Sequence, residues 1–235
     1  MNILVLTDSF ASRFIENLRN NKAINLSTSY QFEDIKKSID VVFTYNYDKI
    51  IPVEYFDIPK IGIFVLHSSD LPKGRGWAPI YNSIANKEEK YVISLIKISE
   101  SPDCGNIFLK LNLNKPKLIT NNNLRNVDEI ASEVLVNHFI GLCLSGNVNR
   151  NTTGYKQDNT NATYYKKRTP EDNVVDKDKS ISSAIYKILS TNENYPSFVE
   201  IDGVKVYLSS NTLLLHQSLR TKGNSHLLTI FYRLH

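Results

Sequence analysis

IGIFVLHSSDLPKGRGWAP, residues 61–79, holds the transition that decides the fold, from an apolar run to a polar loop rich in glycine and proline. An apolar run without alternation, here at 61–66, is typical of a strand that is covered on both faces of a sheet. His67 follows directly, and Lys73 and Arg75 lie in the loop. Because ligands bind beyond the carboxyl ends of the strands in open parallel sheets, this pattern predicts a site beside His67.

Apolar runs and helical spacings alternate on both sides of this segment. Continuous apolar strands between helices predict an α/β domain over residues 1–150, with a mostly parallel sheet that is covered on both faces. The predicted strands are 3–6, 41–43, 61–66, 91–98 and 106–111, and the predicted helices are 10–18, 32–39, 47–56, 79–85 and 128–144.

The composition changes sharply beyond the last of these helices. Residues 147–162 are mostly Asn, Thr and Gly, which predicts a linker or a mobile loop. A helical face at 181–189 and an alternating pattern at 198–208 around Asp202-Gly203 follow, and the second is a hairpin signal. Residues 151–235 are therefore expected to form a small α+β region, with strand-like runs at 213–215 and 227–232 in its tail.

Composition and charge restrict the class of protein. The chain has 235 residues, 41% of them hydrophobic, and a net charge of +4, far from the basic stripe of a nucleic-acid-binding domain. The two cysteines, Cys104 and Cys143, form no metal-binding or disulfide pattern. The apolar run at 3–6 is too short for a signal peptide or a membrane span. We therefore expect a cytoplasmic protein without a metal, a nucleic acid or a membrane as partner.

Several common catalytic motifs are absent. The turn after the first strand, 7–12, lacks the glycines that bring a backbone close to a dinucleotide pyrophosphate. The sequence also contains no phosphate-binding P-loop, no H-E-x-x-H and no G-x-S-x-G. What remains is a strand-end histidine beside a rigid loop with two cationic residues, which combines a proton-transfer group with an anion-binding site.

The loop resembles the H-x-S-x-L-P-x-x-R-G-x-x-P signature of folate-dependent formyltransferases. Asp103-Cys104-Gly105 matches the Asp-x-Gly that follows in that family, and residues 164–172, YYKKRTPED, are similar to the stretch that opens its appended domain. The resemblance extends from the first strand to about residue 208. It implies a Rossmann-like formyltransferase domain over 1–150 and a small C-terminal α+β extension over 151–235.

The resemblance also implies a chemistry: direct transfer of a formyl group from 10-formyltetrahydrofolate to a primary amine, without a metal. By position His67 and Asp103 are the catalytic residues, with Asp103 orienting His67, while Val65, Pro102 and Asp103 contact the folate. The family has Asn two residues before the histidine, where this chain has Val65. We expect Ser68, Ser69, a backbone amide or a water to supply the hydrogen bond that valine cannot donate.

The length favours a small acceptor over a transfer RNA, since about 85 residues follow position 150. The resemblance is closest to sugar N-formyltransferases and implies a nucleotide-linked amino-dideoxy sugar, such as a dTDP-linked 3-amino- or 4-amino-dideoxyhexose, for surface polysaccharide such as lipopolysaccharide O-antigen. A homodimer is compatible with it. Two alternatives are another small amine and a non-catalytic, folate-binding regulatory domain. The residues expected to bind the diphosphate, base or sugar are Lys73, Arg75, Trp77, Tyr164, Lys166 and Arg168.

Overall fold

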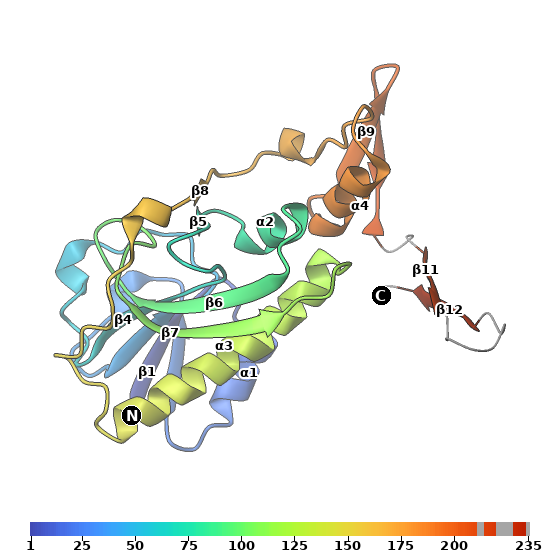
Figure 1. Ribbon diagram of the computed structural model, residues 1–235. Coiled ribbons are helices and arrows are strands. Elements are labelled where there is room, and N and C mark those ends of the chain that lie inside the picture. The colour runs from blue at the N-terminus through green and yellow to red at the C-terminus, as the bar shows by residue number, and fades with distance from the viewer. Residues whose placement is uncertain (211–213, 220–227, 234–235) are drawn as a thin grey trace.

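A six-stranded sheet forms the centre of the computed structural model, which describes residues 1–210, 214–219 and 228–233 (Figure 1). The strand order is β2-β1-β3-β4-β6-β7, and only β6 runs against the direction of the others. The strands are β1 (Asn2–Leu6), β2 (Asn25–Ser29), β3 (Val41–Thr44), β4 (Gly62–His67), β6 (Lys90–Lys97) and β7 (Ile107–Asn114). The prediction of a mostly parallel α/β sheet is confirmed.

The two faces of the sheet are covered differently. Helices α1 (Arg13–Arg19), α2 (Pro79–Ala85) and α3 (Asn121–Leu144) bury the larger core on one face. The other face is covered by irregular chain, where Ile35 and Ile51 pack against β1, β3 and β4. The predicted helices 32–39 and 47–56 are therefore wrong, because only single 3-10 turns form there, at Phe32–Asp34 and Val53–Tyr55. An apolar side chain can pack on this face of the sheet from a non-helical backbone, so the spacing of apolar residues in the sequence does not by itself establish a helix.

The structure differs from the sequence prediction in a polar edge strand and at the polar start of a helix. Strand β2, with the sequence NLSTS, was not predicted, since this edge strand has no apolar run. Helix α3 begins a full two turns before the predicted start, because Thr120 caps it by accepting a hydrogen bond from the backbone N–H of Asn123. No helix among the described residues is long and apolar enough to cross a bilayer.

The C-terminal region contains helix α4 (Ile181–Ser190), which packs on α2, and the hairpin β9 (Ser197–Ile201) and β10 (Val204–Leu208). The hairpin turns at Asp202-Gly203, where the sequence signal stands. A second antiparallel pair is formed by β11 (Leu214–Leu219) and β12 (Leu228–Arg233). Residues 213 and 227 of the predicted tail strands lie outside the described residues.

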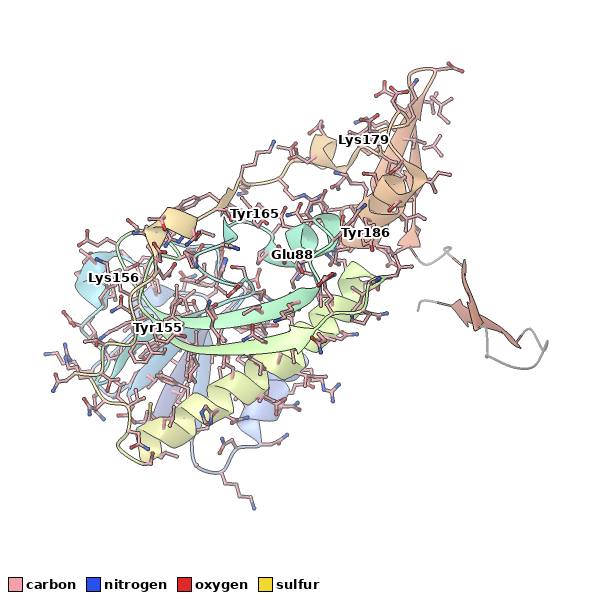
Figure 2. The ribbon with its side chains drawn as sticks, in the orientation of Figure 1. Glu88, Tyr155, Lys156, Tyr165, Lys179 and Tyr186 are labelled. Atoms are coloured by element: carbon pink, nitrogen blue, oxygen red, sulfur yellow. The ribbon has the colours of Figure 1, made fainter. Side chains whose placement is uncertain are left out.

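Residues 147–165 cross the surface of the α/β domain as a strap. Tyr155 pairs with Ile107 of β7, and the two-residue strand β8 (Tyr164–Tyr165) pairs with β5 (Arg75–Gly76) in the predicted site loop (Figure 2). Gln157, in the middle of the strap, is buried. Residues 147–162 thus link α3 to β8, as the linker alternative predicts. Most of their polar side chains are exposed, but the backbone of Tyr155 and the side chains of Gln157 and Asn159 bind the domain.

Candidate active site

A cavity of about 1110 Å³ opens at the carboxyl ends of β3 and β4. One wall comes from the strand ends and from the loops at 46–56 and 98–103, and the opposite wall from residues 76–81 with segments 167–173 and 190–195. Its position follows from the topology, since loops that leave neighbouring parallel strands at the same edge converge there. The volume is that of a site for two ligands of moderate size.

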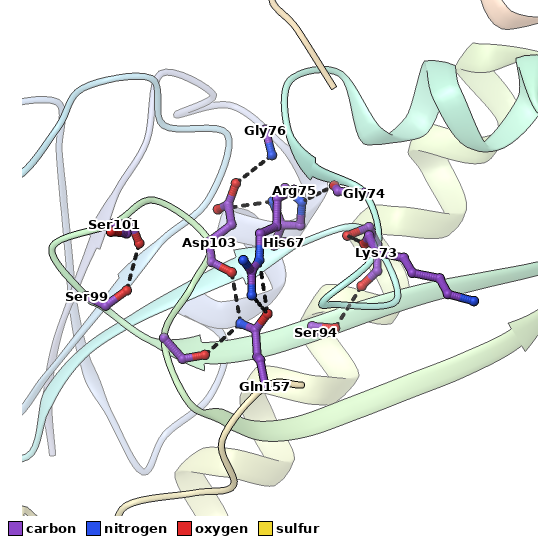
Figure 3. A network of polar contacts seen from close by, with 12 residues as sticks. His67, Lys73, Gly74, Arg75, Gly76, Ser94, Ser99, Ser101, Asp103 and Gln157 are labelled. Carbon is purple, nitrogen blue, oxygen red and sulfur yellow. Dashed lines mark hydrogen bonds and ion pairs between the residues drawn. The ribbon is translucent and has the colours of Figure 1, made fainter. Parts of the chain in front are cut away.

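His67 and Asp103 meet at the base of this cavity. The His67 side chain is 8% exposed, and its Nδ1 lies 3.4 Å from Oδ1 of Asp103 (Figure 3). Its Nε2 lies 2.8 Å from the carbonyl oxygen of Gly74, and the other carboxylate oxygen of Asp103 accepts from the backbone N–H of Gly76 at 2.8 Å. Both ring nitrogens thus face oxygens that only accept. A proton on either nitrogen is held by the oxygen that faces it, and the contact with Asp103 is an ion pair when both nitrogens carry one.

The turn that carries Asp103 is tightly held. Asp103 has a φ of +57°, and the turn passes so close to β6 that the Gly105 position has room for no side chain. The amide of Gln157 donates to the carbonyl oxygens of Asp103 at 2.9 Å and Gly105 at 2.7 Å. Gln157 is therefore a residue of the site that the sequence reasoning missed, because it lies in a stretch of polar residues that carries no signal.

Arg75 connects the site loop to the strap and does not face the cavity. Only 2% of Arg75 is exposed, and its guanidinium donates to Gln157 Oε1, to Asn159 Oδ1 and to the hydroxyl of Tyr164. Figure 3 shows the hydrogen bonds that join Gln157 to Arg75 and to the backbone of the Asp103 turn. The guanidinium therefore orients the amide that holds the Asp103 turn, and each of its three nitrogens already donates to the strap.

Replacing Arg75 by methionine is expected to lower the free energy of unfolding by about 1–3 kcal/mol, because the side-chain oxygen of the buried Gln157 loses its donors. Urea unfolding measures this change. Arg150→Met is the matched control, since Arg150 is half exposed and pairs with the exposed Asp57, so its loss is expected to stay below about 1 kcal/mol. Equal losses in the two variants would contradict the structural role of Arg75.

The structure brings together some of the predicted site residues and separates others. Lys73 extends away from His67 (Figure 3), Tyr164 binds Arg75, and Lys166 pairs with Asp172 at 3.0 Å. These three side chains and Arg75 do not line the cavity. The predicted residues that do line it are Val65, His67, Trp77, Pro102, Asp103 and Arg168.

Cationic and aromatic side chains form the wall opposite the strand ends. The Nζ of Lys167 lies 4.5 Å from the ring centre of Trp77, which is 41% exposed, and the guanidinium carbon of Arg168 lies 3.2 Å from the ring centre of Tyr81. Arg168 also donates to Asn173. Lys167 was not singled out from its neighbour Lys166, because the sequence does not show which lysine of a pair faces the cavity. This wall offers positive charge beside flat apolar surface.

A buried carboxylate lies behind the strand end. Asp128 of α3 accepts from the hydroxyls of Ser68 at 2.6 Å and Tyr91 at 2.7 Å, while Tyr45 is a longer third partner at 3.4 Å. Burial raises the pKa of the Asp128 carboxyl, and these hydrogen bonds oppose that rise. Burial also raises the pKa of Tyr91 well above its ordinary value. The network fixes Ser68, the residue directly after His67, to helix α3.

Comparison with known proteins places this geometry in context. No model of a known protein family matches the chain. The methionyl-tRNA formyltransferase of Pelagibacter ubique (strain HTCC1062) is 32% identical over 172 residues, which cover 71% of this chain and 52% of that protein. The chain spans about half the length of several of the curated relatives it matches.

Solved structures share the fold over most of the chain. A methionyl-tRNA formyltransferase from Clostridium thermocellum matches with a TM-score of 0.69 at 22% identity and covers 99% of both chains. An N-formyltransferase from Helicobacter canadensis, in complex with folinic acid and dTDP-3-aminofucose, matches with a TM-score of 0.68 at 16% identity and covers 93% of this chain and 88% of that one.

Proposed function

Because the chain is related to the folate-dependent formyltransferases and has their fold, we propose that it transfers a formyl group from 10-formyltetrahydrofolate to the amino group of a nucleotide-linked amino-dideoxy sugar. The observation that carries the proposal is the His67–Asp103 pair at the base of a cavity large enough for two ligands. On this proposal the protein works in the cytoplasm and its product enters a surface polysaccharide. A homodimer is the assembly we propose.

The wall at the strand ends suits a folate. Pro52, Val65, Ile96, Ile98 and Pro102 give it apolar surface against which the flat face of a pterin ring can pack. When bound, the folate supplies the formyl group to be transferred. The carboxyl ends of β3 and β4 put this surface next to His67, so a group carried by the folate meets the His67–Asp103 pair.

The opposite wall suits a sugar nucleotide. Lys167 and Arg168 supply positive charge for a diphosphate, and Trp77 supplies a partly exposed ring for stacking on a base or a sugar. This replaces the expected contribution of Lys73, Arg75 and Lys166, whose side chains lie outside the cavity. With the two ligands on opposite walls, the amine and the formyl carbon meet over His67.

His67 and Asp103 then handle protons and charge. Asp103, held by Gly76, orients the ring and balances its charge whenever the ring takes up a second proton. His67 holds a proton next to the reacting carbon, where negative charge grows on the formyl oxygen and the leaving nitrogen needs a proton. Their 3.4 Å separation is of the length that often shortens when a substrate binds.

The test is a formyl-transfer assay with 10-formyltetrahydrofolate and a panel of dTDP-, UDP- and GDP-linked 3-amino and 4-amino sugars. We expect one sugar to gain the mass of one carbonyl group, with release of tetrahydrofolate. Methionyl-tRNA belongs in the panel, because the curated relatives include enzymes named for it. Formylation of the tRNA alone would overturn the sugar assignment, and folate binding without any product would favour a regulatory domain.

A further inference from the structure

The proposed reaction gains from a second hydrogen-bond donor beside His67, because both ring nitrogens of His67 also face oxygens of the chain. When a nucleophile adds to the formyl carbon, the carbonyl oxygen becomes an oxyanion, and a donor already in place stabilises it strongly in a site that excludes water. Val65, which precedes His67 by two residues on the same face of β4, has no donor. Any donor assigned to this oxyanion rests on the proposed function.

Most hydroxyl groups around the cavity are already engaged. Ser68 donates to Asp128, and Ser69 in the adjoining loop donates to the carbonyl oxygen of Lys73, so neither of the two serines expected to replace the missing amide is free. Among the described residues, the other serine and threonine hydroxyls of the cavity wall that have partners are those of Ser9, Ser99, Thr169, Ser190 and Thr191.

Thr44 is the exception among the described serines and threonines that line the cavity. It is the last residue of β3, it is 6% exposed, it lines the cavity, and its hydroxyl has no hydrogen-bond partner. The hydroxyl is not among the described buried atoms that lack a partner, so it is reachable from the cavity. Thr44 thus offers a ligand in the cavity a donor that no acceptor of the chain occupies.

The register of the sheet puts this donor in the right place. Thr44 pairs with Val65 of the neighbouring parallel strand, so the two side chains stand next to each other on one face, about 4.8 Å apart at the backbone. Because side chains alternate along a strand, His67 lies on that same face. Both strands end here, and the Thr44 side chain therefore stands beside Val65 on the face that carries His67, and all three residues line the cavity.

We infer that Thr44 is a catalytic residue whose hydroxyl donates a hydrogen bond to the formyl oxygen as it becomes an oxyanion. In the transfer step the bond from the amine nitrogen to the formyl carbon forms, the bond from that carbon to N10 of the folate breaks, and one proton passes from the amine to N10. Water can take the place of the amine, and the products are then formate and tetrahydrofolate. Thr44 serves both reactions, because both pass through the same oxyanion.

The test compares Thr44→Val, which removes the hydroxyl and keeps the shape, with Thr44→Ser, which keeps the hydroxyl. We expect Thr44→Val to lower the rate constant of formate release by about 10²–10³-fold with little change in KM for the folate, because the lost contact strengthens only as charge develops. Thr44→Ser is expected to stay within about tenfold of the unchanged protein. Thr28→Val is the matched control, since Thr28 is a strand threonine outside the cavity.

Two further measurements report on the hydrogen bond from the Thr44 hydroxyl itself. In Thr44→Val, isotope-edited infrared spectra of bound [¹³C-formyl]-10-formyltetrahydrofolate should show the carbonyl stretch at higher wavenumber, as expected for a lost hydrogen bond. Adding Val65→Asn to Thr44→Val should recover at least about tenfold in rate, since the neighbouring position then donates.

An unchanged carbonyl stretch, or equal losses in Thr44→Val and Thr44→Ser, would overturn the role of Thr44. Formate release and the infrared spectrum need no acceptor amine. A failure of the sugar assignment, seen as no formylated sugar, therefore remains distinct from a failure of this inference.

Discussion

Asp103→Asn is expected to lower the turnover number for formyl transfer by about 10²–10⁴-fold, the range in which a positioned proton-transfer group contributes. The asparagine carbonyl can keep the hydrogen bond from the backbone of Gly76, so the turn is retained. The amide NH₂ then faces Nδ1 of His67, which must accept instead of donate. The ring is left neutral, without the carboxylate that balances its charge.

The measurement is steady-state kinetics together with a melting curve, because the loss must come from chemistry and not from unfolding. Asp70→Asn is the matched control. It removes a carboxylate from the loop that follows His67, but Asp70 is exposed and pairs with Lys110, so the turnover number should change by less than about threefold. An Asp103→Asn enzyme with a turnover within tenfold of the unchanged protein would show that the pair does not carry the reaction.

Gly105→Ala is expected to destabilise the protein by about 4 kcal/mol or more, a size that point mutations reach only through a few severe mechanisms. A Cβ at this position would lie 1.6 Å from the carbonyl oxygen of Lys97 and 2.8 Å from its carbonyl carbon. The obstacle is backbone of β6 and not a flexible side chain, so the turn itself must move. Because this turn carries Asp103, the carboxylate of Asp103 would move away from His67.

Urea unfolding gives the stability change, and Gly141→Ala is the matched control. Gly141 lies in α3 with nothing within 4 Å of the added methyl group. The same substitution there should stabilise the protein by about 0.5–1 kcal/mol, because alanine favours a helix over glycine. If Gly105→Ala unfolds at the same urea concentration as the unchanged protein, the close approach of the turn to β6 does not exist.

Local signals in the sequence were sufficient for much of the fold. Helix 79–85 has the predicted bounds, since it starts at a proline and needs only its own apolar spacing. His67 was placed at a strand end, which depends on a single apolar run. Features that depend on distant parts of the chain were harder to predict. The predicted helices at 32–39 and 47–56 are mostly irregular chain, because the conformation there depends on the shape of the sheet face that these segments cover.

The direction in which charged side chains point in the site was also not predictable from the sequence. Lys73, Arg75 and Lys166 were expected to face a diphosphate, because a loop sequence does not say to which side a long cation turns. Arg75 turns inward, since Gln157 and Asn159 offer acceptors from 82 and 84 residues away. No spacing rule within the loop contains that information, and the strap that provides it was expected to be a linker.

By itself the sequence determined the alternation of elements, the strand end that carries His67 and the motif that supplies Asp103, because each depends on neighbours within a few residues. Only the tertiary structure decided which side chains share the cavity. Thr44 and Val65 are 21 positions apart and stand side by side because β3 and β4 pair in one register. Such juxtapositions depend on the packing of the whole sheet, which no short stretch of sequence specifies.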